Sequence, residues 1–240
     1  MTTRLLALDS STETLHLALC VGEAVHRVAA PGGAQASTTL LPTVQRLLTD
    51  AGLSVRDLDA IAFGRGPGAF TGLRTACSVA QGLAAGADRP VLMLDTLALV
   101  AESARQRGGP LRVWVGLDAR MHEVYAACWH WEAAAGWVAE QSVALYTPGI
   151  LAEHVAASGL GMVGNALLAY PEALAALGRP EGALAQPEGA ALEALARAAW
   201  ARGEGLDSAL ALPLYVRDKV AQTTAERTAQ KVAPKKGIAP

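Results

Sequence analysis

The sequence predicts an α/β protein in which a mixed β-sheet flanked by helices is built twice. Three apolar runs joined by short turns open the chain, a pattern typical of an antiparallel meander. Helical and strand-like patterns then alternate as far as residue 95. After the turn at Gly108 and Gly109 the succession begins again, as a repeat of pattern and not of sequence. With 240 residues and 52% hydrophobic content, the chain can form one large domain or two small ones.

The first half supplies the clearest elements. Apolar spacing predicts helices at residues 37–51 and 73–87, and strands at residues 4–9, 15–21, 24–29, 60–63 and 90–95. Pro42 lies early in its helix, where proline is tolerated better than farther along, and Gly52 supplies a stop signal. Three antiparallel strands followed by helix, strand, helix and strand is the order of ribonuclease-H-like proteins, an architecture shared by actin and sugar kinases.

A glycine-rich segment, residues 64–74, connects the fourth strand to the second helix. Glycines let backbone N–H groups approach a ligand closely, and a helix N-terminus favours anions. The segment therefore offers a phosphate or nucleotide site, with Asp9, Gly66, Gly68, Gly72 and Asp118 as candidate contacts. A tight structural turn is the alternative. The segment has neither the Walker pattern nor GxGxxG spacing, and residues 1–218 contain no lysine.

In the second half, strands are expected at residues 111–118, 123–129 and 137–145, with Asp118 at a strand end as Asp9 is in the first half. Helices broken by loops are expected over residues 147–200, with a short strand at 163–165. This predicts an N-terminal ribonuclease-H-like subdomain (1–107) that contains the two helices of the first half, a C-terminal actin-like subdomain (108–217) and a basic, mobile tail (218–240).

Composition excludes several classes of function. A net charge of −2 argues against a protein whose whole surface binds nucleic acid. The three cysteines are far apart and the five histidines lack ligand spacing, so we expect neither disulfides nor a metal site. No signal peptide or membrane span is recognisable, which favours a cytoplasmic protein. Four tryptophans are interpreted as core filler, with a base-stacking platform as the alternative: Trp114, Trp129, Trp131 and Trp137.

Four segments resemble the bacterial TsaB (YeaZ) family. Residues 64–74 are the most specific of them and depart from the usual form mainly at Ala69, where serine is common. The others are residues 6–11, 118–125 and 213–217, so the resemblance runs in order over residues 1–217. It implies two actin-like (ASKHA) subdomains with mixed sheets flanked by helices.

The resemblance also implies a function. Family members assist TsaD, the subunit that binds metal and transfers the threonylcarbamoyl group to the adenosine next to the tRNA anticodon (t6A), and TsaE, an ATPase, completes the assembly. We therefore expect an accessory subunit and not an enzyme, with tRNA reached through the complex. No cofactor is expected on this chain alone, since ATP, Mg²⁺ and metal belong to the partners. The catalytic relative has an HxxxH metal pair on its first helix, and residues 36–42 contain no histidine.

Family members pair through their first two helices, with TsaD or with a second copy as a homodimer. Carried over to this sequence, the resemblance implies partner-binding residues on both helices: Leu40, Leu41, Val44, Leu47, Leu48, Leu73, Arg74, Val79 and Leu83. From the pattern alone, ordinary core helices are an equal alternative. Two other functions remain open, an independent actin-like ATPase or small-molecule kinase, and a peptidase, although no nucleophile motif supports the latter.

Overall fold

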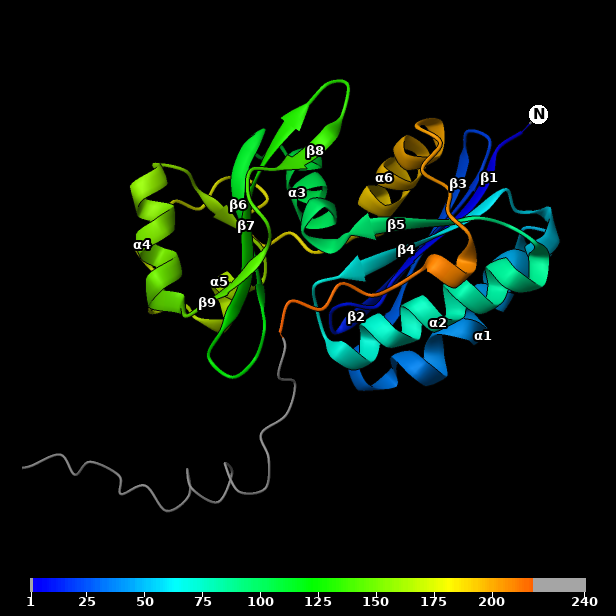
Figure 1. The fold of residues 1–240 in the computed structure, drawn as a ribbon, viewed down its shortest axis with the longest axis horizontal. Helices are drawn as coiled ribbons and strands as arrows, with labels where there is room; N and C mark the ends of the chain where they lie inside the picture. The colour runs from blue at the N-terminus through cyan, green and yellow to red at the C-terminus, as the bar shows by residue number, and fades with distance from the viewer. Residues whose placement is uncertain (1, 218–240) are drawn as a thin grey trace, which may run out of the picture.

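The computed structural model describes residues 2–217, which form two mixed β-sheets with helices around them (Figure 1). The first sheet has the order β3-β2-β1-β4-β5. Its strands β1, β2 and β3 are an antiparallel meander, while β4 and β5 run parallel to β1. The strands are β1 (Arg4–Asp9), β2 (Thr14–Val21), β3 (Ala24–Pro31), β4 (Ala60–Gly66) and β5 (Val91–Asp95). This is the ribonuclease-H-like order that the sequence predicts.

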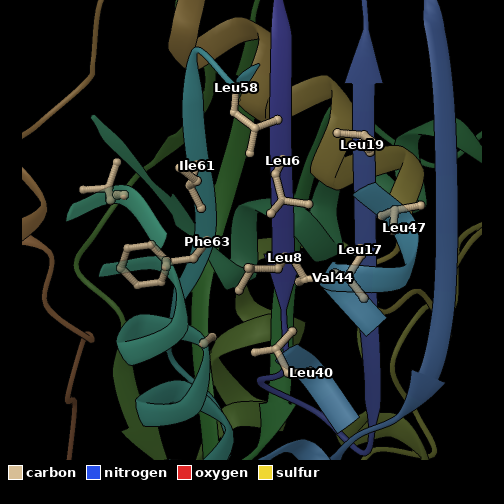
Figure 2. Close-up of a cluster of buried hydrophobic side chains, with 14 of the residues drawn as sticks. Leu6, Leu8, Leu17, Leu19, Leu40, Val44, Leu47, Leu58, Ile61 and Phe63 are labelled. Carbon is tan, nitrogen blue, oxygen red and sulfur yellow. The ribbon is translucent and has the colours of Figure 1, made fainter. Parts of the chain in front are cut away.

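Strand β1 supplies the cores on both faces of this sheet because successive side chains of a strand point to opposite faces. Leu6 and Leu8 pack with side chains of α1 (Ala36–Asp50) and α2 (Phe70–Ala87), as Figure 2 shows for Leu40 and Val44. Leu5 and Ala7 pack on the opposite face, with α6 (Gly189–Ala201). A strand covered on both sides explains the uninterrupted apolar run in the sequence.

The second sheet has the order β10-β6-β7-β8, in which β6 and β7 are antiparallel and β10 is parallel to β6. The expected third strand at 137–145 is divided in two, because β8 and β9 both pair with β7 and are separated by residues 140–143. The second sheet thus repeats the strand order of the first sheet over four strands, with β6, β7, β8 and β10 in the places of β1, β2, β3 and β4. The strands are β6 (Arg112–Asp118), β7 (Val124–Glu132), β8 (Gly136–Ala139), β9 (Ala144–Tyr146) and β10 (Met162–Val163).

Helices join the two halves. The buried helix α3 (Thr96–Gln106) follows β5 and lies between α6 and the second sheet (Figure 1). Helices α4 (Pro148–Ser158) and α5 (Ala166–Ala169) cover the far face of the second sheet. The expected boundary at residue 107 lies in the turn between α3 and β6, whereas the later helix α6 packs on the first sheet. Residues 108–217 therefore contribute to both halves.

After α6 the chain returns along the first half. Leu206 bridges to Val91 of β5, and a short 3-10 turn, η3 (Ser208–Leu210), lies against α2. We call residues 211–217 the C-terminal strap, because they run from α2 to the β6–β7 turn. Turns η1 (Gly33–Gln35) and η2 (Val55–Asp57) flank α1. The tail predicted at 218–240 lies outside the described residues.

Candidate functional site

A cavity of about 260 Å³ lies between the two halves of the molecule. Its walls come from the turn after β1, the start of α2, the turn after β6 and the C-terminal strap. These are the four segments that carry the family resemblance, so the fold brings them together from across the chain. The lining residues used below are Ser11, Gly68, Phe70, Asp118, Arg120, Asn165, Tyr215 and Arg217.

Asp9 does not line this cavity. Its side chain is fully buried, where Oδ1 accepts hydrogen bonds from the Ser11 N–H at 2.9 Å and the Ser11 hydroxyl at 2.6 Å. The Thr96 hydroxyl lies 3.4 Å from Oδ2. Burial raises the pKa of Asp9 to about 6, although these hydrogen bonds oppose the rise. The carboxylate is therefore committed to interactions inside the chain.

The three glycines predicted as phosphate contacts allow two backbone segments to pack closely. A Cβ on Gly72 would lie 1.7 Å from the carbonyl oxygen of Ser10, and one on Gly68 would lie 2.6 Å from Ser11. Gly66 has φ +115°, a conformation that favours glycine. Only Gly68 lines the cavity, whereas Gly66 and Gly72 are buried.

Two backbone donors of the glycine segment are also occupied. The Gly66 N–H donates to the Thr96 hydroxyl at 3.1 Å, and the Ala69 N–H donates to the Ser11 carbonyl at 2.8 Å. A phosphate cradle needs free N–H groups pointing at the ligand. With these donors occupied and Asp9 buried, the segment fits the tight structural turn better than a nucleotide site.

Asp118 does reach the cavity. Its carboxylate accepts a hydrogen bond from the Tyr170 hydroxyl at 2.8 Å and forms an ion pair with Arg120 at 3.3 Å. The Asp118 N–H donates to the Asn165 side chain at 2.8 Å. The sequence analysis missed Asn165 and Tyr170, because they follow Asp118 by 47 and 52 residues and no local pattern links them.

The turn after β6 has an unusual backbone that the strap holds in place. Arg120, Met121 and His122 have φ values of 61°, 53° and 60°, in the left-handed region that non-glycine residues seldom adopt. Arg217 donates to the Ala119 carbonyl at 3.0 Å and forms an ion pair with Glu123. Arg217 belongs to a segment that resembles the TsaB family, but the sequence pattern predicts no role for this residue.

The helix residues predicted to bind a partner separate into two groups. Five of them belong to the core of this chain and cannot contact a partner: Leu40, Val44, Leu47, Leu48 and Leu73. That part of the prediction is wrong, because the apolar stripe of each helix packs on the chain's own sheet (Figure 2). Leu41 and Arg74 are exposed, and Val79 and Leu83 are half-buried.

Arg74 is nevertheless engaged within the chain. Its guanidinium lies 3.7 Å from the centre of the Phe70 ring and donates to the Tyr215 hydroxyl at 3.1 Å. The residue thus connects α2 to the C-terminal strap. Across residues 2–217, no cluster of three or more His, Cys, Asp or Glu side chains is placed to hold a metal ion. None of the helices in this range is long and apolar enough to cross a membrane.

The sequence is similar to a protein-family model and to known proteins. Residues 30–131 match the family described as "TsaD: tRNA N6-adenosine threonylcarbamoyltransferase". A relative from Escherichia coli (strain K12) is 34% identical over 226 residues, covering 91% of this chain and 96% of the relative. A relative from Haemophilus influenzae is 43% identical over 122 residues, covering 50% of this chain and 51% of the relative. Both are named "tRNA threonylcarbamoyladenosine biosynthesis protein TsaB".

The fold is also similar to that of solved structures. YeaZ from Pseudomonas aeruginosa matches with a TM-score of 0.77 at 39% identity, covering 89% of this chain and 99% of that one. A second structure, of a Pseudomonas aeruginosa protein described as similar to peptidase YeaZ, matches with a TM-score of 0.79 at 39% identity, covering 90% of this chain and 100% of that one. The molecule is thus a two-part α/β protein of the actin-like class, as expected from the sequence. The chain belongs to the TsaB (YeaZ) family.

Proposed function

We propose that this chain takes part in tRNA threonylcarbamoyladenosine biosynthesis as the non-catalytic partner of TsaD. The observation that carries the proposal is the 34% identity to the Escherichia coli TsaB relative across 96% of that protein. A likeness that covers 91% of this chain extends over both halves of the molecule. The chain would then act as an accessory subunit of the threonylcarbamoyl transferase complex.

Two features of the chain support a non-catalytic role. Residues 36–42 contain no histidine, although the resemblance implies a metal-binding HxxxH pair on the first helix of the catalytic relative. In addition, Asp9 is buried and the N–H groups of Gly66 and Ala69 are bonded within the chain. These residues do not fit the Mg²⁺ and nucleotide of other actin-like proteins. ATP, Mg²⁺ and metal would accordingly be supplied by TsaD and TsaE.

The partner would dock on the outer face of α1 and α2. We define this docking face by the exposed or half-buried side of the two helices, which includes Leu41, Ser78, Val79, Gly82 and Leu83. Small residues on α2 would let a partner helix approach closely, and Leu41 would add an apolar anchor. The same face would form the homodimer when TsaD is absent. TsaE and tRNA would be reached through the complex.

The proposal is tested by reconstitution. Threonylcarbamoyl transfer to tRNA is measured in a mixture of TsaD, TsaE and the adenylate-forming enzyme, with and without this chain. We expect modification only when the chain is present, and neither ATP hydrolysis nor tRNA modification by the chain alone. Equal modification without the chain would overturn the proposal.

An independent ATPase or small-molecule kinase is the second candidate, and the cavity beside the glycine segment is the observation in its favour. It predicts Mg²⁺-dependent ATP turnover by the isolated chain. Substitution of Asp118, a carboxylate that lines the cavity, would then abolish the turnover. Turnover that depends on Asp118 would favour this candidate over the accessory role.

A further inference from the structure

Exposed apolar side chains gather in one short segment near the end of the described chain. Ten large hydrophobic side chains are exposed in residues 2–217, and four of them lie between positions 206 and 215: Leu206, Leu210, Leu212 and Tyr215. A single exposed apolar residue is ordinary on a protein surface, whereas a cluster of them marks a surface that binds something apolar. The segment includes η3 and most of the C-terminal strap.

Leu210 and Leu212, which we call the outer leucines, face solvent although the residue between them is fully buried. Ala211 is 0% exposed and belongs to the core beneath the first sheet, whereas Leu210 and Leu212 are 60% and 66% exposed. A segment used only for the stability of this chain would bury a leucine and not the smaller alanine, because hydrophobic stabilisation rises with the apolar area buried. The outer leucines therefore have no role in the core.

Hydrogen bonds hold the outer leucines beside α2. The Gln81 side chain donates to the carbonyls of Ser208 and Ala211, at 3.2 and 2.9 Å. The Cys77 thiol donates to the same Ala211 carbonyl at 3.4 Å. An apolar surface that is already fixed on a helix loses little conformational freedom when a partner binds, which favours association.

The outer leucines border the docking face. Successive residues of a helix are rotated by about 100°, so Gly82 lies between Gln81, which bonds to the strap, and Leu83 on the opposite side. Ser78 is exposed one turn earlier on the same strip. Figure 1 shows α2 between α1 and η3. The surface is thus a strip of small residues with half-buried Leu83 along one border and the outer leucines along the other.

An α-helix with an apolar face is the kind of partner that fits this surface. Small residues let the axis of a partner helix come close, and apolar side chains on both borders cover its flanks. The TsaD family model matches residues 30–131, a range that includes α1 and α2, so a TsaD protein should itself contain a helix equivalent to α2. This match and the continuity with the docking face favour TsaD as the occupant.

We propose that Leu210 and Leu212 belong to the surface that binds TsaD, where they contact the flank of a TsaD helix lying on α2. The inference rests on the proposed function, in which TsaD docks on α1 and α2. It extends the docking face from these two helices to η3 and the strap.

The test is calorimetric titration of the full chain with TsaD. We expect Leu210→Glu and Leu212→Glu each to weaken binding at least about tenfold, because a charge replaces a leucine that is buried on association. Leu168 in α5 is 59% exposed and lies on the second half of the molecule, so Leu168→Glu is the matched control and should keep the wild-type affinity. Leu212→Met, which conserves volume and apolar character, should bind within about threefold of wild type.

A second measurement needs no substitution. The outer leucines and the residues around them are covered in the proposed complex, so hydrogen exchange of residues 208–212 should slow several-fold when TsaD is bound. Exchange of α5 should stay unchanged and serves as the internal control.

The proposal is overturned if Leu210→Glu and Leu212→Glu bind TsaD as tightly as wild type. It is also overturned if the two variants weaken only self-association of the chain, since a second copy would then cover the outer leucines. Failure of the accessory role looks different. If wild type does not bind TsaD, both proposals are wrong, whereas loss of binding in Gly82→Arg with unchanged binding in Leu212→Glu keeps the docking face and removes only the outer leucines from it.

Discussion

At the scale of single residues, glycines in segment 64–74 are required by packing. Gly72 lies in α2, where a Cβ would stand 1.7 Å from the Ser10 carbonyl oxygen. The clash is with backbone, so no side-chain rotation can relieve it. The same spacing of glycines would serve an anion cradle, which is why the sequence alone left both interpretations open.

The first prediction concerns Gly72. We expect Gly72→Ala to lower the free energy of unfolding by roughly 2–3 kcal/mol, because the turn after β1 must move away from α2. Gly86, also in α2, has open space where a Cβ would lie, with no atom within 4 Å, so Gly86→Ala is the matched control. That control should be neutral or stabilised by up to about 1 kcal/mol. Urea denaturation measures both, and equal effects would contradict the packing role.

The second prediction concerns Asp9, whose pKa is raised from 3.8 to about 6 by burial. Between these values the folded state binds more protons than the unfolded state, so stability falls as pH rises. Asp9→Asn removes this titration. The unfolding free energy of the variant relative to wild type should therefore increase by on the order of 2–3 kcal/mol from pH 4 to pH 7. If the unfolding free energies of wild type and Asp9→Asn differ by the same amount at every pH, the raised pKa of Asp9 is contradicted.

At the scale of elements, the helical periodicity of apolar residues predicts which positions are buried, but not whether the chain's own sheet or a partner protein covers them. Val44 and Leu48 follow the predicted apolar stripe of α1, and both pack in the core beneath the first sheet. A stripe that faces a sheet and one that faces a partner have the same period. Leu41, in contrast, is exposed and accessible to a second protein.

The third prediction follows from that burial. Val44 is fully buried, so Val44→Asp places a charge in the core and should unfold the chain instead of selectively blocking association. Circular dichroism and thermal melting measure the outcome. A folded Val44→Asp protein that fails only to bind TsaD would contradict the assignment of Val44 to the core.

The fourth prediction tests the docking face. Gly82 on α2 and Gly149 on α4 both have open space around a Cβ, so an arginine at either position should leave the fold intact. Gly82→Arg should abolish co-purification with TsaD, because a long charged side chain prevents close helix approach, whereas Gly149→Arg should retain it. If TsaD binds both variants equally, the partner docks elsewhere.

At the scale of the whole molecule, the C-terminal strap connects the two halves. The Leu214 N–H donates to the Arg65 carbonyl at 2.7 Å at the start of the glycine segment, and Arg217 holds the turn after β6. The turn keeps three left-handed residues in sequence, a conformation that costs about 1–2 kcal/mol for each residue. The strap therefore stabilises a backbone that local preferences oppose.

The fifth prediction concerns Arg217. Arg217→Ala should speed hydrogen exchange in residues 119–123, and lower the unfolding free energy by about 1–3 kcal/mol, because hydrogen bonds to a charged donor are lost. Arg202 pairs only locally with Glu204 and is exposed, so Arg202→Ala is the control. If the hydrogen-exchange rate of residues 119–123 is the same in Arg217→Ala as in wild type, the strap does not hold this turn.

The order of the elements in the first half, and the repeat of this pattern in the second half, could be predicted from the sequence. This was possible because hydrophobic periodicity and glycine breaks are local properties of the chain. Four short motifs in the sequence resemble the TsaB family, although the sequence could not show that these segments meet at one cavity.

Contacts between residues far apart in the chain became apparent only from the three-dimensional structure. It placed Asp9 inside the core and Asp118 at the cavity, although both end a strand. Leu40 and Val44, which were predicted to bind a partner, lie in the core. Trp129, Trp131 and Trp137 line a second cavity, which shares no residue with the first. These outcomes depend on contacts between residues far apart in the chain, and no short-range pattern in a single sequence encodes such contacts.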